Sequence, residues 1–216
     1  MMLIDGKKIA AELREELKKE VFELKSKYNK VPGLTVILIG EDAPSQIYVR
    51  NKEKSANEVG LKSEVIKYPD SVEEKTVLNK IEELNKDETV SGILVQLPLP
   101  KHIDKQKVIE TISPNKDVDG LHPMNVGNLS SGYQGSIPCT PLGCYFLIKV
   151  ASWVFHLNLI SQQQLLFFHL NLVQFFLSLN NIQEEHMELN FHNLRIGFQH
   201  SWDEIHQHLY LVKLLL

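Results

Sequence analysis

Hydrophobic and polar positions change their spacing repeatedly along the first 149 residues. Between residues 9 and 28, apolar residues recur every three or four positions with Glu and Lys between them, which predicts an amphipathic helix. Residues 34–39 instead form an unbroken apolar run that stops at Gly40, which is typical of a buried parallel strand. The chain is therefore predicted to begin with a helix followed by a strand that is covered on both faces.

The same alternation continues towards residue 149. Ser71 and Glu74 have the spacing of a capping box, and Thr140 precedes Pro141 as a cap precedes the first residue of a helix. Strands that alternate with helices imply parallel β/α units. We therefore predict an α/β fold, with a parallel sheet and flanking helices. The other predicted elements are helices over 45–59, 71–84 and 104–112 and strands over 63–68 and 92–97.

The composition changes abruptly after residue 149. Residues 1–149 hold all nine Pro, ten of the eleven Gly and 21 of the 23 Lys and Arg, whereas residues 150–183 contain no charged residue. Two stretches with such different composition are not expected to form one fold. We predict one domain over 1–149 and an atypical tail over 150–216, which is helical or irregular and has no Rossmann fold.

Three interpretations of this tail remain open. Residues 165–177 are apolar, but a membrane span needs about 20 mostly apolar residues, and His169, Asn171 and Gln174 interrupt the run. A membrane is therefore disfavoured as a partner. A helical core segment is the second interpretation. The third, which we favour, is a shifted reading frame, a mispredicted exon or intron read-through.

Charge, cysteine and histidine content limit the expected partners and location. The net charge of −4 gives no sequence-wide basic field, so nucleic acid is not an expected partner. Cys139 and Cys144 are too few for a disulfide framework or a zinc cluster. The histidines of the tail have irregular spacings and no organised carboxylates, so no metal site is expected. No signal peptide is visible, and the expected location is cytoplasmic.

Four side chains stand where an α/β fold places ligand-binding groups. Tyr48 and Lys52 are four residues apart, so on a helix they share one face, one turn apart. Gln96 and Asp119 each fall where a predicted strand or buried run gives way to a loop marked by Pro or Gly, where α/β folds keep ligand groups. A phenol, an amine, an amide and a carboxylate could thus converge on one polar heterocycle.

Each candidate residue also has a purely structural interpretation. Lys52 could be a solvated helix lysine, and Tyr48 could be a core aromatic. Gln96 could satisfy the backbone of its loop, and Asp117 and Asp119 could both be turn formers, because Asp-Gly is a turn signal. Ser45 could be only the N-cap of its helix.

Several motifs in a fixed order surround these residues. Together they resemble the bifunctional methylenetetrahydrofolate dehydrogenase/methenyltetrahydrofolate cyclohydrolase family over residues 2–149, and several motifs in order are far more specific than one. The matching segments are 39–45 (IGEDAPS) with Tyr48 and Lys52, 92–100 (GILVQLPLP), 113–123 (SPNKDVDGLHP), 125–127 (NVG) and 138–143 (PCTPLG).

The resemblance implies a role for each candidate residue. Lys52 would be the general acid/base of a folate enzyme, and Gln96 would hydrogen-bond and tune it. Tyr48 would stack on the folate ring system, and Asp119 would accept hydrogen bonds from the amino group and ring nitrogen of the pterin. Ser45 belongs to the same substrate-binding set. A lysine acts as a base only when it is neutral, and burial in a cleft favours that form.

The resemblance also implies a two-step reaction. Hydride passes from methylenetetrahydrofolate to NADP, and water then opens the methenyl product to formyltetrahydrofolate. The family holds its dinucleotide on a turn of the form Gly-Arg-Ser-x-x-Val-Gly-x-Pro and closes the folate site with a Pro-Gly-Gly-Val-Gly-Pro loop. Residues 150–216 contain neither.

These departures set the expected activity. We expect impaired activity, especially in the dehydrogenase step, and no cofactor-binding residues in this chain. The alternative is a non-catalytic truncated product that binds folate weakly or is unstable. The family forms homodimers through its second domain, so the oligomeric state here stays open, as does the choice between NAD and NADP.

Overall fold

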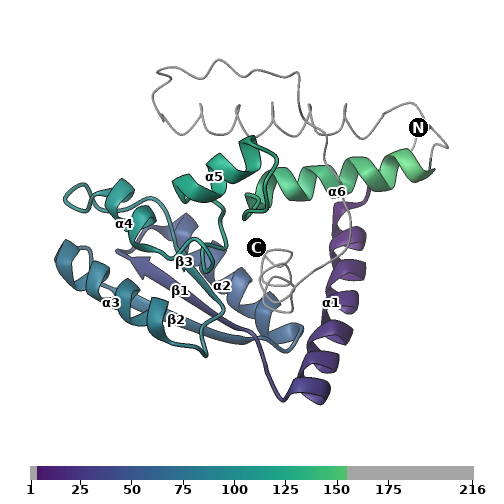
Figure 1. Cartoon of the computed structure of the whole chain (residues 1–216), viewed down its shortest axis with the longest axis horizontal. Coiled ribbons are helices and arrows are strands. Elements are labelled where there is room, and N and C mark those ends of the chain that lie inside the picture. The colour runs from purple at the N-terminus through teal and green to yellow at the C-terminus, as the bar shows by residue number, and fades with distance from the viewer. Residues whose placement is uncertain (1–3, 155–216) are drawn as a thin grey trace.

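The computed structural model describes residues 4–154 of the 216-residue chain. Helices and strands alternate through most of this region, and Figure 1 shows helices on both sides of a small sheet. The elements in chain order are α1 (Gly6–Tyr28), β1 (Gly33–Ile39), α2 (Ala43–Glu58), β2 (Lys62–Tyr68), α3 (Glu74–Lys86), β3 (Gly92–Val95), α4 (Lys105–Thr111), α5 (Pro123–Ser130) and α6 (Cys139–Val154).

The sheet of the described region has three parallel strands in the order β2-β1-β3. β1 pairs along its whole length with β2, from Gly33 opposite Lys62 to Ile39 opposite Tyr68. Its other edge pairs with β3, which begins at Gly92 opposite Leu34. The predicted α/β fold with a parallel sheet is confirmed.

The central strand β1 divides the core into two halves because successive side chains of a strand point to opposite faces. Leu34, Val36 and Leu38 pack with apolar residues of α1 and α2. Ile37 and Ile39 pack with those of α3 and α4. Every residue of β1 is buried, which explains why its sequence is an unbroken apolar run rather than an alternating one.

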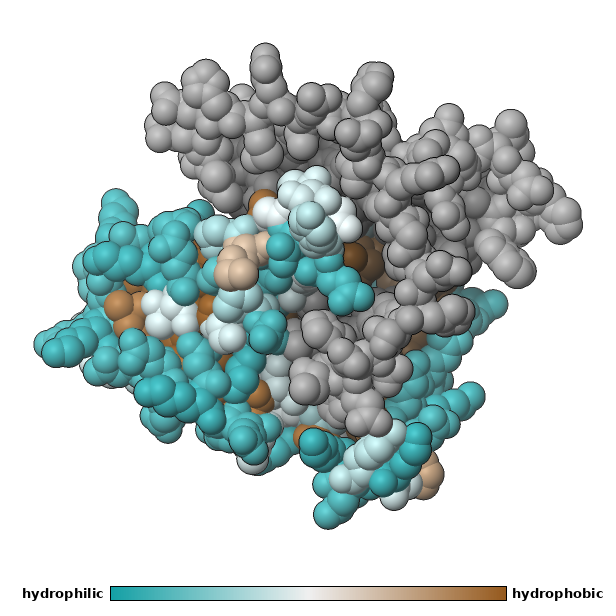
Figure 2. Space-filling model, viewed as in Figure 1, coloured by the Kyte–Doolittle hydropathy of each residue, from teal (hydrophilic) through white to brown (hydrophobic). Residues whose placement is uncertain are grey.

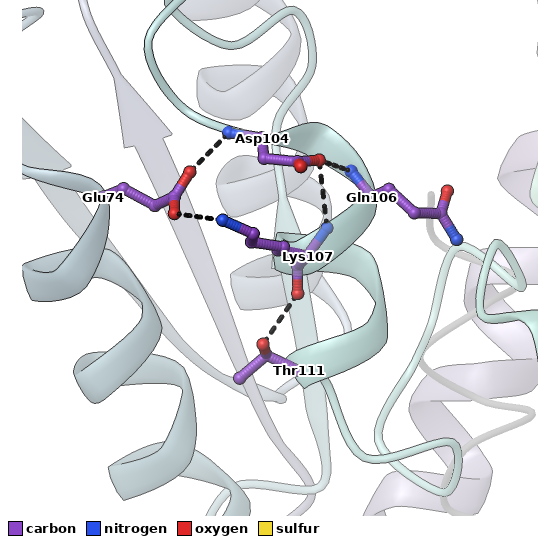
Figure 3. A network of polar contacts seen from close by, with 5 residues as sticks. All are labelled: Glu74, Asp104, Gln106, Lys107 and Thr111. Carbon is purple, nitrogen blue, oxygen red and sulfur yellow. Dashed lines mark hydrogen bonds and ion pairs between the residues drawn. The ribbon is translucent and has the colours of Figure 1, made fainter.

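Polar contacts join the two helices on the α3 side of the sheet. The Glu74 carboxylate accepts from the Asp104 backbone N–H at 2.7 Å and from Lys107 Nζ at 3.1 Å, which ties the start of α3 to the start of α4 (Figure 3). Asp104 caps α4 by accepting from Gln106 and Lys107. The outer surface over these helices is mostly hydrophilic (Figure 2).

Three predicted boundaries are wrong. The capping box at Ser71 does not form, because a turn precedes α3, which begins at Glu74, and the Glu74 carboxylate binds α4 instead. β3 ends at Val95 rather than at residue 97, and Pro98 just beyond has no N–H for a ladder. α6 begins at Cys139, so Thr140 lies inside this helix and is not its cap.

Two features lie beyond the sequence predictions. The helix α5 was not predicted; His122 caps it by accepting from the Met124 backbone N–H at 3.1 Å. The fold predicted for residues 150–216 falls outside the described residues, except that α6 runs to Val154. Within residues 4–154, none of the helices combines the length and hydropathy that a membrane crossing requires.

Candidate active site

The carboxyl ends of the parallel strands meet at one edge of the sheet, where α/β folds bind ligands. β1 ends at Ile39, and the turn at Gly40, with φ of 80°, leads into α2. Asp42 caps this helix by accepting from the Ser45 backbone N–H at 2.9 Å and from the Ser45 hydroxyl at 2.6 Å. α2 therefore starts at the carboxyl edge of the sheet.

Lys52 of α2 meets Gln96 at the end of β3. Lys52 Nζ donates to Gln96 Oε1 across 3.5 Å, which is a long contact. The amide nitrogen of Gln96 donates to the Leu97 carbonyl at 2.8 Å, which fixes the amide with its oxygen towards Lys52. Two residues that lie 44 positions apart in the sequence are thus brought together.

Asp119 belongs to the same group of side chains. Burial raises the pKa of the Asp119 carboxyl above its ordinary value of 3.8; the positive charge of Lys52 acts against this shift, and the negative charge of Asp117 adds to it. Asp119 as a whole residue is half-buried, but protein surrounds its carboxyl group, which disfavours the charged form and raises the pKa. Lys52 therefore contacts the Gln96 amide, and its charge also acts on the Asp119 carboxyl group.

Tyr48 lies one turn before Lys52 on α2 and is 59% exposed. This exposure excludes the interpretation of Tyr48 as a core aromatic. An exposed phenol ring one turn from a lysine offers a flat apolar surface to a heteroaromatic ligand.

Ser45 does not cap α2, because Asp42 does. The Ser45 side chain is buried, and besides its bond to Asp42 its hydroxyl lies 3.5 Å from the Leu97 carbonyl. Ser45 therefore connects the start of α2 to the loop that follows Gln96. Its predicted contact with substrate stays a prediction.

A small apolar recess lies beside this group. Leu97, Val108 and Asp119 line it, whereas Tyr48 and Lys52 do not. A single cleft bordered by all four predicted residues stays a prediction. Among residues 4–154, no three His, Cys, Asp or Glu side chains are grouped as a metal site requires.

Sequence reasoning missed two buried polar residues that hold the Asp119 loop. The sequence predicts Asp117 only as a turn former and Asn125 only as part of the matching segment 125–127, yet their side chains hydrogen-bond to each other at 2.9 Å. The signal that could have found them is the pair of aspartates around Val118 followed by a helix that begins with Pro and contains an Asn.

Fold and site together define an α/β domain of the ligand-binding type, with its polar groups at the carboxyl edge of a parallel sheet. Residues 4–119 match the family model of the tetrahydrofolate dehydrogenase/cyclohydrolase catalytic domain. The chain belongs to this family.

Known relatives are similar over the first part of the chain. The bifunctional protein FolD of Pelagibacter ubique is 83% identical over 149 residues, which are 69% of this chain and 53% of the relative. That of Listeria innocua is 54% identical over 147 residues, 68% of this chain and 51% of the relative. The chain thus spans about half the length of the curated relatives it matches.

Solved structures are also similar to this chain over part of its length. The FolD crystal structure from Campylobacter jejuni has a TM-score of 0.68 at 46% identity, and covers 70% of this chain and 54% of that chain. A Trypanosoma brucei enzyme in complex with NADP cofactor and an inhibitor has a TM-score of 0.68 at 36% identity, and covers 70% and 52%.

Proposed function

We propose that residues 1–149 bind a tetrahydrofolate derivative and hydrolyse methenyltetrahydrofolate to formyltetrahydrofolate, with Lys52 as the general acid/base. The observation that carries this proposal is the position of Lys52, whose Nζ contacts Gln96 Oε1 and lies in the electrostatic field of Asp119. Membership of the tetrahydrofolate dehydrogenase/cyclohydrolase family supports it.

Lys52 moves protons in this proposal. Its amine takes a proton from the water that attacks the methenyl carbon and returns a proton to the ring nitrogen when the ring opens. Gln96 holds the amine through its oxygen, since its own nitrogen is engaged with the Leu97 carbonyl. A lysine on a regular helix and an amide locked by its loop give the fixed geometry that proton transfer requires.

Asp119 and Tyr48 bind the substrate. The Asp119 carboxylate accepts two parallel hydrogen bonds from the amino group and ring nitrogen of the pterin, which orients the ring. Tyr48 stacks on the folate ring system with its exposed face. Ser45 contributes through the loop of Leu97 and, by the same proposal, borders the bound substrate.

The dehydrogenase step is the weaker part of the activity. NADP would supply the hydride acceptor, and its pyrophosphate would need a glycine-rich turn before a helix. The helix after β1 does not fit this group, because the Asp42 carboxylate already occupies the amides at its start and repels a phosphate. Residues 150–216 contain one glycine. Loss of nicotinamide positioning can remove about 7–11 kcal/mol of barrier lowering.

Two absorbance assays of the purified 216-residue polypeptide test this function. One follows hydrolysis of methenyltetrahydrofolate, and the other follows its formation from methylenetetrahydrofolate with NADP or NAD. Weak hydrolysis above a Lys52→Met blank, without dehydrogenase turnover, is expected. Hydrolysis equal to the blank would favour a weak folate binder instead, and robust dehydrogenase turnover would overturn the proposed impairment.

The small-molecule partner in this proposal is a folate, and the proposed location is the cytoplasm.

A further inference from the structure

A buried carboxylate anchors the loop that carries Asp119. Asp117 is 3% exposed, and both of its oxygens are hydrogen-bonded. Oδ1 accepts from the Gly120 backbone N–H at 3.0 Å. Oδ2 accepts from the His122 backbone N–H at 2.9 Å and from Asn125 Nδ2 at 2.9 Å. A buried charge is tolerated only when it is bonded in this way, so the loop and the carboxylate stabilise each other.

Asn125 extends this anchor to two further segments. Its side chain is 4% exposed, and Nδ2 also donates to the Pro114 carbonyl at 2.9 Å. Its Oδ1 accepts from the Ser136 backbone N–H at 3.1 Å. The amide thus joins the start of the loop, the helix α5 and the segment that leads into α6.

The loop is also held from its other side. Gly120 has φ of 67°, and a Cβ at this position would lie 2.7 Å from the Ser136 carbonyl oxygen. The backbone beside Asp119 therefore has little freedom. The loop that carries Asp119 is therefore held by the hydrogen bonds of the Asp117 carboxylate and by close packing of Gly120 against the backbone of Ser136.

We propose that Asp117 is a positioning residue of the folate site, which holds Asp119 in reach of Lys52 through its bonds to Gly120 and His122. This inference rests on the proposed function of Asp119. A simple turn former would be exposed and would bond only two or three residues ahead, whereas Asp117 is buried and reaches His122 and Asn125. The three groups that donate to the Asp117 side chain also require a carboxylate, because an asparagine side chain offers only one acceptor oxygen.

Asp117 acts on Asp119 through its charge as well. The charged groups whose fields act on Asp119 among the described residues are Lys52 on α2 and Asp117 on its own loop. The negative charge of Asp117 raises the pKa of Asp119, after the larger effect of burial, and Lys52 lowers it. Removal of the Asp117 charge should therefore lower the pKa of Asp119.

The test compares Asp117→Asn with Asp87→Asn in the full 216-residue chain. Asp87 is a matched control, because its carboxylate also bonds a nearby backbone N–H in a loop, that of Thr89, but is exposed and lies at the opposite edge of the sheet. For methenyltetrahydrofolate hydrolysis by Asp117→Asn, we expect KM to rise about tenfold with a smaller change in kcat. The acid limb of the kcat/KM profile should move to lower pH, because the pKa of Asp119 falls. A smaller folded fraction would lower kcat/KM without moving this limb.

Hydrogen exchange of the Gly120 and His122 backbone amides gives a readout that does not depend on catalysis. Both amides should exchange about tenfold faster in Asp117→Asn and be unchanged in Asp87→Asn. Unaltered exchange, KM and acid limb in Asp117→Asn would overturn this inference and leave the proposed function standing. An inactive wild type with exchange that depends on Asp117 would overturn the proposed function alone.

Asn125→Ala keeps the inference testable if Asp117→Asn does not fold. This variant removes one donor and keeps the Asp117 charge, so KM should rise less and the acid limb should not move to lower pH. An unchanged KM in a folded Asn125→Ala protein would overturn the positioning role.

Discussion

Two lysines at opposite edges of the sheet have very different surroundings. Lys116, on the amino side, donates to the Leu84 carbonyl at 2.8 Å and to the Asp87 carbonyl at 2.7 Å, where α3 ends. Lys52, on the carboxyl side, donates to the Gln96 side chain across 3.5 Å. One ammonium group has two short bonds to backbone carbonyls, and the other has a single long contact to a side-chain amide.

On the proposed function, one edge of the sheet serves stability and the other serves chemistry. Lys116 satisfies carbonyls that a helix end leaves without partners, and a positive charge is favoured there by the helix dipole. Lys52 leaves donor capacity for a ligand or a proton in transit. We expect substitutions at the amino edge to change stability and substitutions at the carboxyl edge to change activity.

The largest expected effect is that of Lys52→Met. Loss of a general acid/base lowers kcat for hydrolysis by about 10²–10⁴-fold. The free energy of unfolding should change by less than about 0.5 kcal/mol, as for a side chain without a strong structural bond. Steady-state kinetics and urea unfolding measure the two quantities. Lys54→Met, at an exposed position of the same helix, is the control and should leave both unchanged. Equal activity of the two variants would remove Lys52 from the site.

Lys116→Met should produce the opposite pattern. The Leu84 and Asp87 carbonyls lose their charged donor, which should lower the free energy of unfolding by about 1–2 kcal/mol. The kcat of the folded fraction should stay unchanged, because Lys116 lies away from Gln96 and Lys52. Urea denaturation and active-site titration check this prediction. A loss of kcat without a loss of stability would show that the two edges are not separate.

Asp119→Asn should stabilise the domain while it weakens folate binding. Because the pKa of Asp119 is raised in the folded state, the folded protein holds this proton more tightly than the unfolded chain. Stability is therefore highest below the unfolded value of 3.8 and falls as pH rises through the raised folded value. The stability of Asp119→Asn does not fall in this way, because asparagine does not titrate. Its melting temperature should therefore exceed that of the wild type at pH 7 and approach it in acid. A lower melting temperature of Asp119→Asn at pH 7 would contradict this sign.

The smallest expected effect concerns the cap of α2. Hydrogen bonds from the Ser45 hydroxyl and backbone N–H lower the pKa of Asp42 below its ordinary value of 3.8. A lowered folded pKa contributes stability above pH 3.8, and this contribution is lost as pH falls through the folded value. Wild type should therefore be slightly more stable than Asp42→Ala at pH 6, and the difference should shrink below pH 3.8. Thermal unfolding across this range measures it, and a difference that grew in acid would refute the capping role.

The sequence predicted the parts of the fold that depend on local pattern. The buried run of β1 and the amphipathic spacing of α1 were predicted correctly. A strand buried on both faces has a continuous apolar run, whereas a helix buried on one face has apolar residues every three or four positions. The helix α5 was missed because it is short, contains Gly127 and has few apolar residues to set a period. β3 was drawn too long because Leu97 is apolar, although the chain turns before Pro98.

The site was partly accessible to the same reasoning. The meeting of Lys52 with Gln96 follows from parallel topology, since strand ends share an edge. The hydrogen-bond partners of Asp117 and Asn125 were not accessible, because they come from segments whose arrangement local sequence does not specify. The raised pKa of Asp119 depends on burial, which likewise appears only in the folded chain.

The most direct test of the folate site is a titration of the ¹⁵N-labelled chain with 5-formyltetrahydrofolate, followed by amide chemical shifts. The site assignment predicts saturable shifts at the backbone amides of Tyr48, Gln96 and Asp119, with weaker binding in Asp119→Asn. Saturable shifts confined to α3 and α4, or no saturable shift, would contradict the assignment of a folate site to this edge of the sheet.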